Sequence, residues 1–174
     1  MVKKLFLILG ILIVVGLVGT GVTVAAAVLG KAQKCSEPVE GQVRSEQVLE
    51  NLIETTGVTI PDAEATALAQ KYLAGKVSDA RVCFTPGLGH ISGSINLGAV
   101  NPSFYVSTGI DVSGATPKTV NLDIRIGSLP SLSFLSPAQK AIENLINENL
   151  SKARLTKKYS VAFGQGQAEI VRAK

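Results

Sequence analysis

A long uncharged run near the start of the chain limits what this sequence can fold into more than any other feature. Every residue from Leu5 to Gly30 is uncharged, and almost all are apolar or glycine. A helix over this run is about 39 Å long at 1.5 Å per residue, more than the ~30 Å hydrocarbon core of a bilayer. Cleaved signal peptides have shorter apolar stretches, roughly 7–15 residues. The sequence therefore predicts an uncleaved transmembrane anchor over residues 1–30, with cleavage near Ala25-Ala26-Ala27 as the alternative.

The charges beside this run do not decide which side of the membrane the rest of the chain occupies. Lys3 and Lys4 precede it, and Lys31 and Lys34 follow it, so the positive-inside rule has no excess to count. We expect the C-terminal part to lie outside the cytoplasm, because the globular mass follows the run and only four residues stand before it. The sequence thus predicts a single-pass protein of the cell membrane.

Outside the apolar run the charges nearly balance, which argues against a nucleic-acid partner. The chain has 17 Lys and Arg against 13 Asp and Glu, and two of the basic residues, Lys3 and Lys4, precede the run. The pI of about 9.1 therefore does not describe a basic domain. The chain has no Trp, five Phe and three Tyr, so aromatic side chains for stacking on bases are few. The expected partner is the bilayer. We expect no nucleic-acid partner, and the sequence identifies no protein partner.

After the apolar run the sequence changes character twice. Residues 31–44 are polar and contain one Pro and one Gly, which predicts a short stalk. From there on apolar residues recur regularly, so we expect a globular domain over residues 45–174. The domain is expected to open with two helices, the first from Ser45 to a stop at Gly57 and the second from Pro61 to a stop at Gly75.

Beyond the second helix the apolar residues follow a period of two, which is typical of strands. The clearest alternation puts Val120, Leu122, Ile124 and Ile126 on one face and polar residues on the other. Hairpin-length links separate the strands, so the sequence predicts an antiparallel sheet with one face in water. The expected strands are Arg81–Thr85, His90–Leu97, Ser103–Ser113, Thr119–Ile126, and a closing hairpin of Lys158–Phe163 with Ala168–Arg172.

The strongest helical pattern lies between this sheet and the closing hairpin. From Ala138 to Leu150 apolar residues recur at i, i+3, i+4, i+7 and i+8, while polar residues such as Asn147 take the opposite face. The predicted fold class is therefore α+β, with a single N-terminal transmembrane helix followed by a mainly antiparallel sheet packed on a long amphipathic helix.

No set of residues in the sequence marks a catalytic or metal centre. His90 is the one histidine, and its place at a strand start beside a turn is that of an ordinary polar residue. Cys35 and Cys83 are not a CxxC pair, and no G-x-S-x-G surrounds a serine. The sequence therefore predicts a protein that is not an enzyme and holds no cofactor and no metal.

The two cysteines leave two states open. Outside the cytoplasm they can form a disulfide, which would close a loop of about 48 residues and stabilise the fold by roughly 4 kcal/mol in the chain-entropy model. They can also remain free thiols, because Cys35 lies on the predicted stalk and the sequence does not set its distance from Cys83.

The order of the segments resembles a known family. The resemblance rests on IPDAEATALAQKYL, VCFTPG with HISGSI, NPSFYVSTGIDV and VNLDIRIGSLP, followed by the long helix and the closing hairpin. This order, over about Ile60 to Arg172, is similar to the YpmS-like family of membrane-anchored extracytoplasmic proteins. It is more distantly similar to LmeA-like phospholipid-binding proteins, which resemble the tubular lipid-binding (TULIP) superfamily. There a strongly curved antiparallel sheet wraps a long helix around an apolar cavity, so the resemblance implies lipid binding and supplies no catalytic residues.

The expected function is therefore the binding of a lipid or another apolar ligand by a membrane-anchored domain. The residues expected to line its cavity lie on the sheet and on the long helix: Val106, Leu122, Ile124, Ile142, Leu145 and Ile146. The same side chains would form an ordinary packed core if there were no cavity. The alternative function is a structural or protein-partner-binding domain outside the cytoplasm, with a filled core and no ligand.

Overall fold

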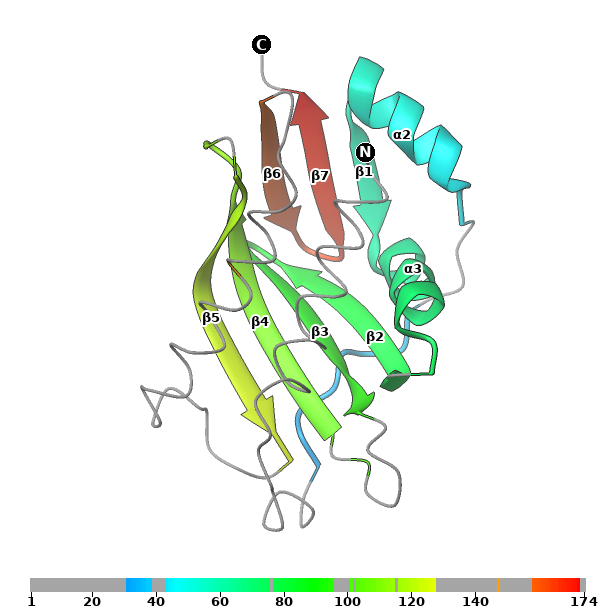
Figure 1. The fold of residues 1–174 in the computed structure, drawn as a ribbon, viewed down its shortest axis with the longest axis vertical. Helices are drawn as coiled ribbons and strands as arrows, with labels where there is room; N and C mark the ends of the chain where they lie inside the picture. Colours follow the sequence, from blue (N-terminus) through cyan, green and yellow to red (C-terminus); the bar gives the residue numbers. More distant parts are fainter. Residues whose placement is uncertain are drawn as a thin grey trace.

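The computed structural model describes residues 31–38, 43–75, 77–95, 101, 103–114, 116–127, 147 and 158–172. Over these residues the chain has an α+β fold with two helices and two antiparallel sheets (Figure 1), which confirms the predicted class. The predicted anchor over residues 1–30 lies outside the described residues, and so does the predicted helix Ala138–Leu150 apart from Asn147. Neither of the two described helices has the length and apolar character needed to cross a bilayer.

Both predicted helices at the start of the domain are confirmed. Helix α2 spans Glu46–Thr55, and the side chain of Ser45 accepts a hydrogen bond from the first turn, as an N-cap does. Helix α3 spans Asp62–Leu73 and follows Pro61, with two acidic residues in its first turn that suit the positive end of the helix dipole. Apolar residues on one side of each helix are buried in the core.

The strands form two sheets. The larger has the order β2-β3-β4-β5, the smaller has the order β1-β7-β6, and every neighbouring pair is antiparallel. Strand β1 was not predicted, because four residues between two helices are too few to show an alternation. The bounds are β1 Val58–Pro61, β2 Val77–Thr85, β3 Leu88–Ile95, β4 Ser103–Asp111, β5 Lys118–Ile126, β6 Tyr159–Gly164 and β7 Gln167–Arg172.

The two sheets meet where the β2–β3 turn touches the β6–β7 turn. The rings of Phe84 and Phe163 stack with their centroids 5.5 Å apart. The backbone N–H of Gly87 donates to the Phe163 carbonyl, and that of Gly166 donates to the Phe84 carbonyl, each over 3.0 Å. One apolar core continues through this junction, since residues of both sheets and both helices belong to a single buried cluster.

A β-bulge in β5 corrects the predicted alternation of that strand. Leu122, Ile124 and Ile126 are buried as expected, but Val120 is 41% exposed. The register shows the reason, because Asn121 and Leu122 together lie opposite the single residue Thr108 of β4. Asn121 takes a φ of 54°, a left-handed conformation that asparagine tolerates better than most residues. The extra residue reverses the parity of the strand, so the prediction for Val120 is wrong.

A second bulge lies at the other edge of the larger sheet, in β2. Asp79 has a φ of 53°, and the β2–β3 register shifts there, opposite Gly93. Gly93 lies inside β3, opposite the bulged residues of the partner strand. A Cβ added at Gly93 would lie 2.7 Å from a methyl group of Val77. Gly93 therefore lets the bulged strand approach closely.

Replacing Gly57 by alanine should lower the free energy of unfolding by about 2–5 kcal/mol. Gly57 has a φ of +92°, and an added Cβ would lie 2.5 Å from Val171 Cγ1 and 3.0 Å from the Ile170 carbonyl oxygen. The cost adds about 1–2 kcal/mol for the left-handed backbone to about 1–3 kcal/mol for overpacking. Gly75→Ala is the matched control, because Gly75 has a φ of +80° with nothing within 4 Å. Denaturant unfolding gives the free energy of unfolding of both variants, and the larger loss expected for Gly57→Ala measures the effect of the crowded Cβ. Equal losses in the two variants would contradict this prediction.

Candidate functional site

The larger sheet presents a polar face opposite its apolar face. Residues paired directly across antiparallel strands point to the same side of a sheet. Two cross-strand rows therefore share one side, which we call the outer face; the other side, which carries Phe104 and Val106, is the inner face. The rows are Cys83, His90, Ser107 and Asp123, and next to it Arg81, Ser92, Tyr105 and Arg125.

Residues 31–38, which we call the strap, lie across the outer face. The backbone N–H of Ala32 donates to Ser103 Oγ over 2.8 Å, and that of Cys35 donates to Ser92 Oγ over 3.0 Å. Ala32 and Cys35 are buried there against Tyr105. In Figure 1 the strap is the blue segment that passes behind the larger sheet. The segment predicted as a free stalk is thus, over these residues, part of the folded domain.

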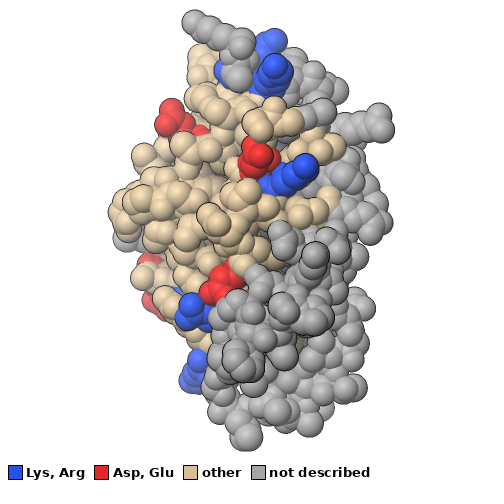
Figure 2. All heavy atoms as spheres, turned by 90° about the vertical axis from the view of Figure 1, so that its left-hand side faces the viewer, with Lys and Arg blue, Asp and Glu red and all other residues tan. Residues whose placement is uncertain are grey.

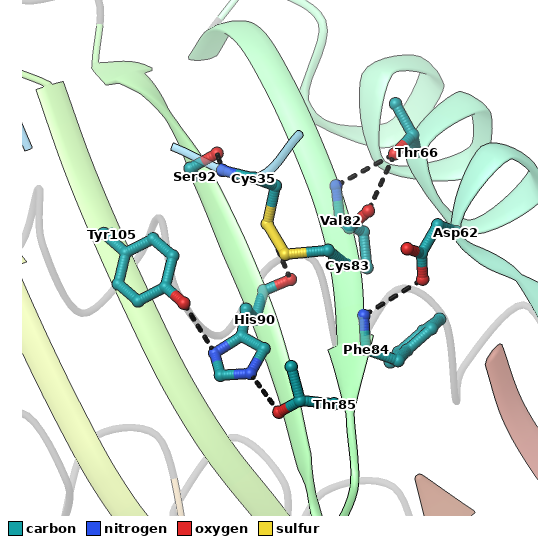
Figure 3. The surroundings of a disulfide bond; sticks show 10 residues. All are labelled: Cys35, Asp62, Thr66, Val82, Cys83, Phe84, Thr85, His90, Ser92 and Tyr105. Atoms are coloured by element: carbon teal, nitrogen blue, oxygen red, sulfur yellow. Dashed lines mark hydrogen bonds between the residues drawn. A yellow bond between two sulfur atoms is a disulfide. The ribbon is translucent and has the colours of Figure 1, made fainter. Parts of the chain in front are cut away.

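A disulfide joins the strap to the sheet. Of the two states that the sequence left open, the structure has Cys35 bonded to Cys83, with their Cα atoms 5.7 Å apart (Figure 3). The hydrogen bond from Cys35 to Ser92 places the strap cysteine over β3, next to Cys83 of β2. The sequence could not show this, because the position of Cys35 depends on bonds that the strap makes with β3 and β4.

Charged side chains hold the strap at the β2 edge. Lys34 Nζ lies 2.6 Å from Asp79 Oδ2, and Arg81 lies 3.0 Å from both Glu37 and Asp79. The hydrogen bond from Lys34, followed by that from Arg81, lowers the pKa of Asp79 against the opposing effect of burial. Exposed pairs of this kind each contribute little, about 0–1 kcal/mol. They fix the position of the strap, since Lys34 and Glu37 join two points of it to the bulged part of β2.

His90 stands at the centre of a hydrogen-bond network on the outer face. Its Nε2 lies 2.7 Å from Thr85 Oγ1, and its Nδ1 lies 2.9 Å from Tyr105 Oη (Figure 3). The His90 and Tyr105 rings also stack, with centroids 5.5 Å apart. His90 is only 8% exposed. The sequence predicted an ordinary polar residue at the edge of a turn, whereas the structure places it inside β3 with both ring nitrogens occupied.

Burial keeps the two rings of this network uncharged near neutral pH. It lowers the pKa of His90 and raises the pKa of Tyr105. A neutral imidazole has one donor and one acceptor nitrogen, and two hydroxyl groups satisfy both. The arrangement therefore fixes side chains of three neighbouring strands, β2, β3 and β4, on the outer face. One signal in the sequence could have indicated this polar face: His90, Ser92 and Ser94 occupy alternate positions of the predicted strand and so lie on one side of it.

We expect the free energy of unfolding to decrease as the pH falls from 7 to 5. The pKa of His90 is lowered in the folded chain, so below about pH 6.5 the unfolded chain binds this proton more readily. The contribution of neutral, buried His90 to the free energy of unfolding is therefore fully present above the pKa that His90 has in the unfolded chain. It is lost as the pH falls toward the lower pKa of His90 in the folded chain. Denaturant unfolding of the whole chain in detergent at several pH values measures the slope. His90→Gln should abolish it, because the chain has one histidine; an unchanged slope in that variant would contradict the assignment.

The inner face holds three of the six residues predicted to line a cavity. Val106, Leu122 and Ile124 are buried in the main core, and Val106 pairs directly with Ile124 across β4 and β5. The other three, Ile142, Leu145 and Ile146, lie outside the described residues. The structure thus brings together the sheet half of the predicted lining.

Within the described part of the chain, no group of three or more His, Cys, Asp or Glu side chains is arranged to hold a metal ion. On the face shown in Figure 2 neutral residues cover most of the described surface, and at two places a basic side chain lies beside an acidic one. One ion pair of this kind joins Arg125 to Asp123 over 3.0 Å.

Comparison of the chain with protein-family models, curated proteins and solved structures finds no match.

Proposed function

We propose that this chain is a membrane-anchored extracytoplasmic protein whose domain binds a lipid or another apolar ligand and catalyses no reaction. In this proposal residues 1–30 are the single transmembrane anchor in the cell membrane, and residues 45–174 form the ligand-binding domain. The resemblance to YpmS-like and LmeA-like proteins implies this function. It also implies that the larger sheet curves around the helix Ala138–Leu150.

The disulfide supports the proposed location. Disulfides persist in oxidising compartments and are rare in the cytosol. Cys35 follows the apolar run closely and is bonded to Cys83, so both cysteines belong on the same side, outside the cytoplasm, if residues 5–30 cross the membrane and the domain lies outside. This agrees with the orientation expected from the position of the globular mass.

The observation that carries the ligand proposal is the continuous apolar inner face of β4 and β5. Phe104, Val106 and Ile124 lie side by side on it, at 1% exposure or less. Helix α3 packs on the far edge of the sheet, where Thr66 Oγ1 exchanges hydrogen bonds with the backbone of Val82 in β2. The face of β4 and β5 is therefore the natural partner of the second apolar surface that the sequence offers, the stripe of the helix Ala138–Leu150.

One described contact supports the proposed place of that helix. Asn147 is helical, and its Oδ1 accepts hydrogen bonds from the Thr119 backbone N–H over 3.0 Å and from Thr119 Oγ1 over 3.1 Å. Thr119 lies near the start of β5. Since Asn147 belongs to the predicted polar face, these two bonds would hold the edge of the helix against β5 while its apolar stripe turns toward the inner face. We propose that the ligand lies between Ile142, Leu145 and Ile146 of the helix and the sheet.

The near-complete burial of the inner face also favours a second candidate. Phe104 is 0% and Val106 1% exposed, values typical of a packed core. In this alternative the domain is structural or binds a protein partner, and the helix fills the space that a ligand would take.

Val106→Phe separates the two candidates. If the inner face lines a cavity, the larger ring takes up ligand volume, so binding of a fluorescent fatty-acyl probe by the purified chain should fall at least tenfold while the fold survives. If the core is filled, the variant should instead lose about 1–3 kcal/mol of stability through overpacking. The matched control is Val120→Phe, because Val120 lies on the neighbouring strand but is 41% exposed. No probe uptake by the parent chain, together with no co-purified lipid, would refute the ligand proposal.

A further inference from the structure

The strap begins where the predicted membrane span ends. Lys31 is the residue after Gly30, and the next residue, Ala32, is buried on the outer face with its N–H bonded to Ser103 Oγ over 2.8 Å. Two extended residues span about 7 Å at most. The point at which the chain leaves the apolar run is therefore held close to Ser103, the first residue of β4.

Three kinds of contact fix the strap to the sheet beyond this point. The N–H of Cys35 bonds to Ser92 Oγ over 3.0 Å, its sulfur is covalently bonded to Cys83, and Lys34 and Glu37 pair with Asp79 and Arg81 of β2. A free stalk would let the domain tumble above the bilayer. A strap bonded along its length does not, because each contact restrains the chain within a few residues of the span.

We propose that one end of the larger sheet, where β4 begins at Ser103 and β5 ends at Ile126, faces the lipid bilayer in a fixed orientation. The partner of this surface is the membrane that holds the anchor. The inference rests on the anchor of the proposed function, but it does not depend on whether the domain binds a ligand. In Figure 1 this end is the lower end of β4 and β5.

In this orientation the opposite end of the larger sheet, where β4 ends at Asp111, lies far from the membrane. Strand β4 has 9 residues, so at about 3.3 Å per residue its Asp111 end stands roughly 26 Å from its Ser103 end. Phe104 and Ile126, which pair across β4 and β5 on the inner face, lie at the membrane end. An apolar molecule leaving the bilayer would thus meet the inner face at its nearest edge.

Single tryptophans test this orientation, because the chain has none of its own. Asn101→Trp and Ser113→Trp place the reporter at exposed positions before and after β4. Each full-length variant is reconstituted in phosphatidylcholine vesicles that carry a nitroxide on the lipid headgroup. We expect the fluorescence of Asn101→Trp to be quenched several-fold more strongly than that of Ser113→Trp. Circular dichroism of each variant checks that the fold is kept.

The strap is tested in the same assay. Ser103→Ala removes the acceptor of the Ala32 N–H, and reduction of the disulfide frees Cys35, so each change should shrink the difference in quenching between the two reporters. Equal quenching of both reporters in a chain that sediments with the vesicles would overturn the orientation and leave the anchor standing. A chain that does not sediment with vesicles would overturn the anchor of the proposed function and the orientation with it.

Discussion

Ile124→Asp is expected to leave the domain unfolded. Ile124 is 1% exposed at the middle of the inner face, where it pairs with Val106. A carboxylate placed there has no described cationic partner, and burying an unpaired charge costs several kcal/mol. Since domains of this size have only about 5–15 kcal/mol of stability in total, the substitution should remove most or all of it. Loss of the strand signal in circular dichroism and rapid digestion by a protease would show the effect.

Val120→Asp is the matched control for this substitution. Both residues lie in β5 and have the same parity in sequence, but the bulge at Asn121 turns Val120 to the surface, where it is 41% exposed. Surface substitutions of this kind usually change stability by no more than about 0.5 kcal/mol. A variant with aspartate at 120 should therefore fold normally. Unfolding of both variants to the same degree would contradict the bulge and restore the regular alternation.

Removal of the disulfide should cost about 4 kcal/mol. Cys35 and Cys83 are separated by 48 positions, and the chain-entropy model gives roughly this value for a loop of that length. Cys35→Ser with Cys83→Ser leaves the strap held by hydrogen bonds and surface ion pairs, which are individually weak. Denaturant unfolding of the double variant, compared with the parent chain under oxidising conditions, measures the loss.

Two further measurements test whether the bond between Cys35 and Cys83 accounts for this loss of stability. Reduction of the parent chain should lower its stability by a similar amount, and the same reductant should leave the double serine variant unchanged. Alkylation before reduction should not change the mass of the parent chain, whereas alkylation after reduction should modify both cysteines. Modification of unreduced protein at Cys35 and Cys83 would show free thiols and refute the bond.

The pattern of local residues was enough to predict the helices and most strands. Ser45 and Pro61 stand directly before the two helices, and Gly57 and Gly75 follow them, because capping and backbone freedom act within a few residues. The alternation of Leu122, Ile124 and Ile126 likewise identified the buried side of β5. These features depend on neighbours in the chain, so the sequence alone contains the information.

The candidate site was less accessible to the same reasoning. The sequence identified Val106, Leu122 and Ile124 as a shared apolar surface, which the cross-strand register of β4 and β5 supports. It did not identify the network of His90, because Thr85 and Tyr105 reach the ring from the two neighbouring strands. A single strand shows that His90 is polar and on which parity it lies, but not which hydroxyl groups its neighbours supply.

Long-range contacts also decided the role of several charged and polar residues. Glu64 lies in the first turn of α3, yet it is 1% exposed and accepts hydrogen bonds from the backbone and guanidinium of Arg44. The guanidinium also donates to the Thr59 carbonyl over 2.6 Å. This pair ties the segment before α2 to α3 and β1. Nothing in the local sequence distinguishes such a carboxylate from a solvated one.

The sequence by itself thus determined the class of fold, the two helices and the apolar side of the sheet, because these follow from spacing and caps within a few residues. Only the tertiary structure decided the parity of Val120 and the position of the strap. A bulge depends on the register between two strands, and the strap depends on Ser92, Ser103 and Cys83, which lie 48 or more positions from their partners in the chain. Contacts at that separation are chosen by the packing of the whole domain, so no window of the sequence contains them.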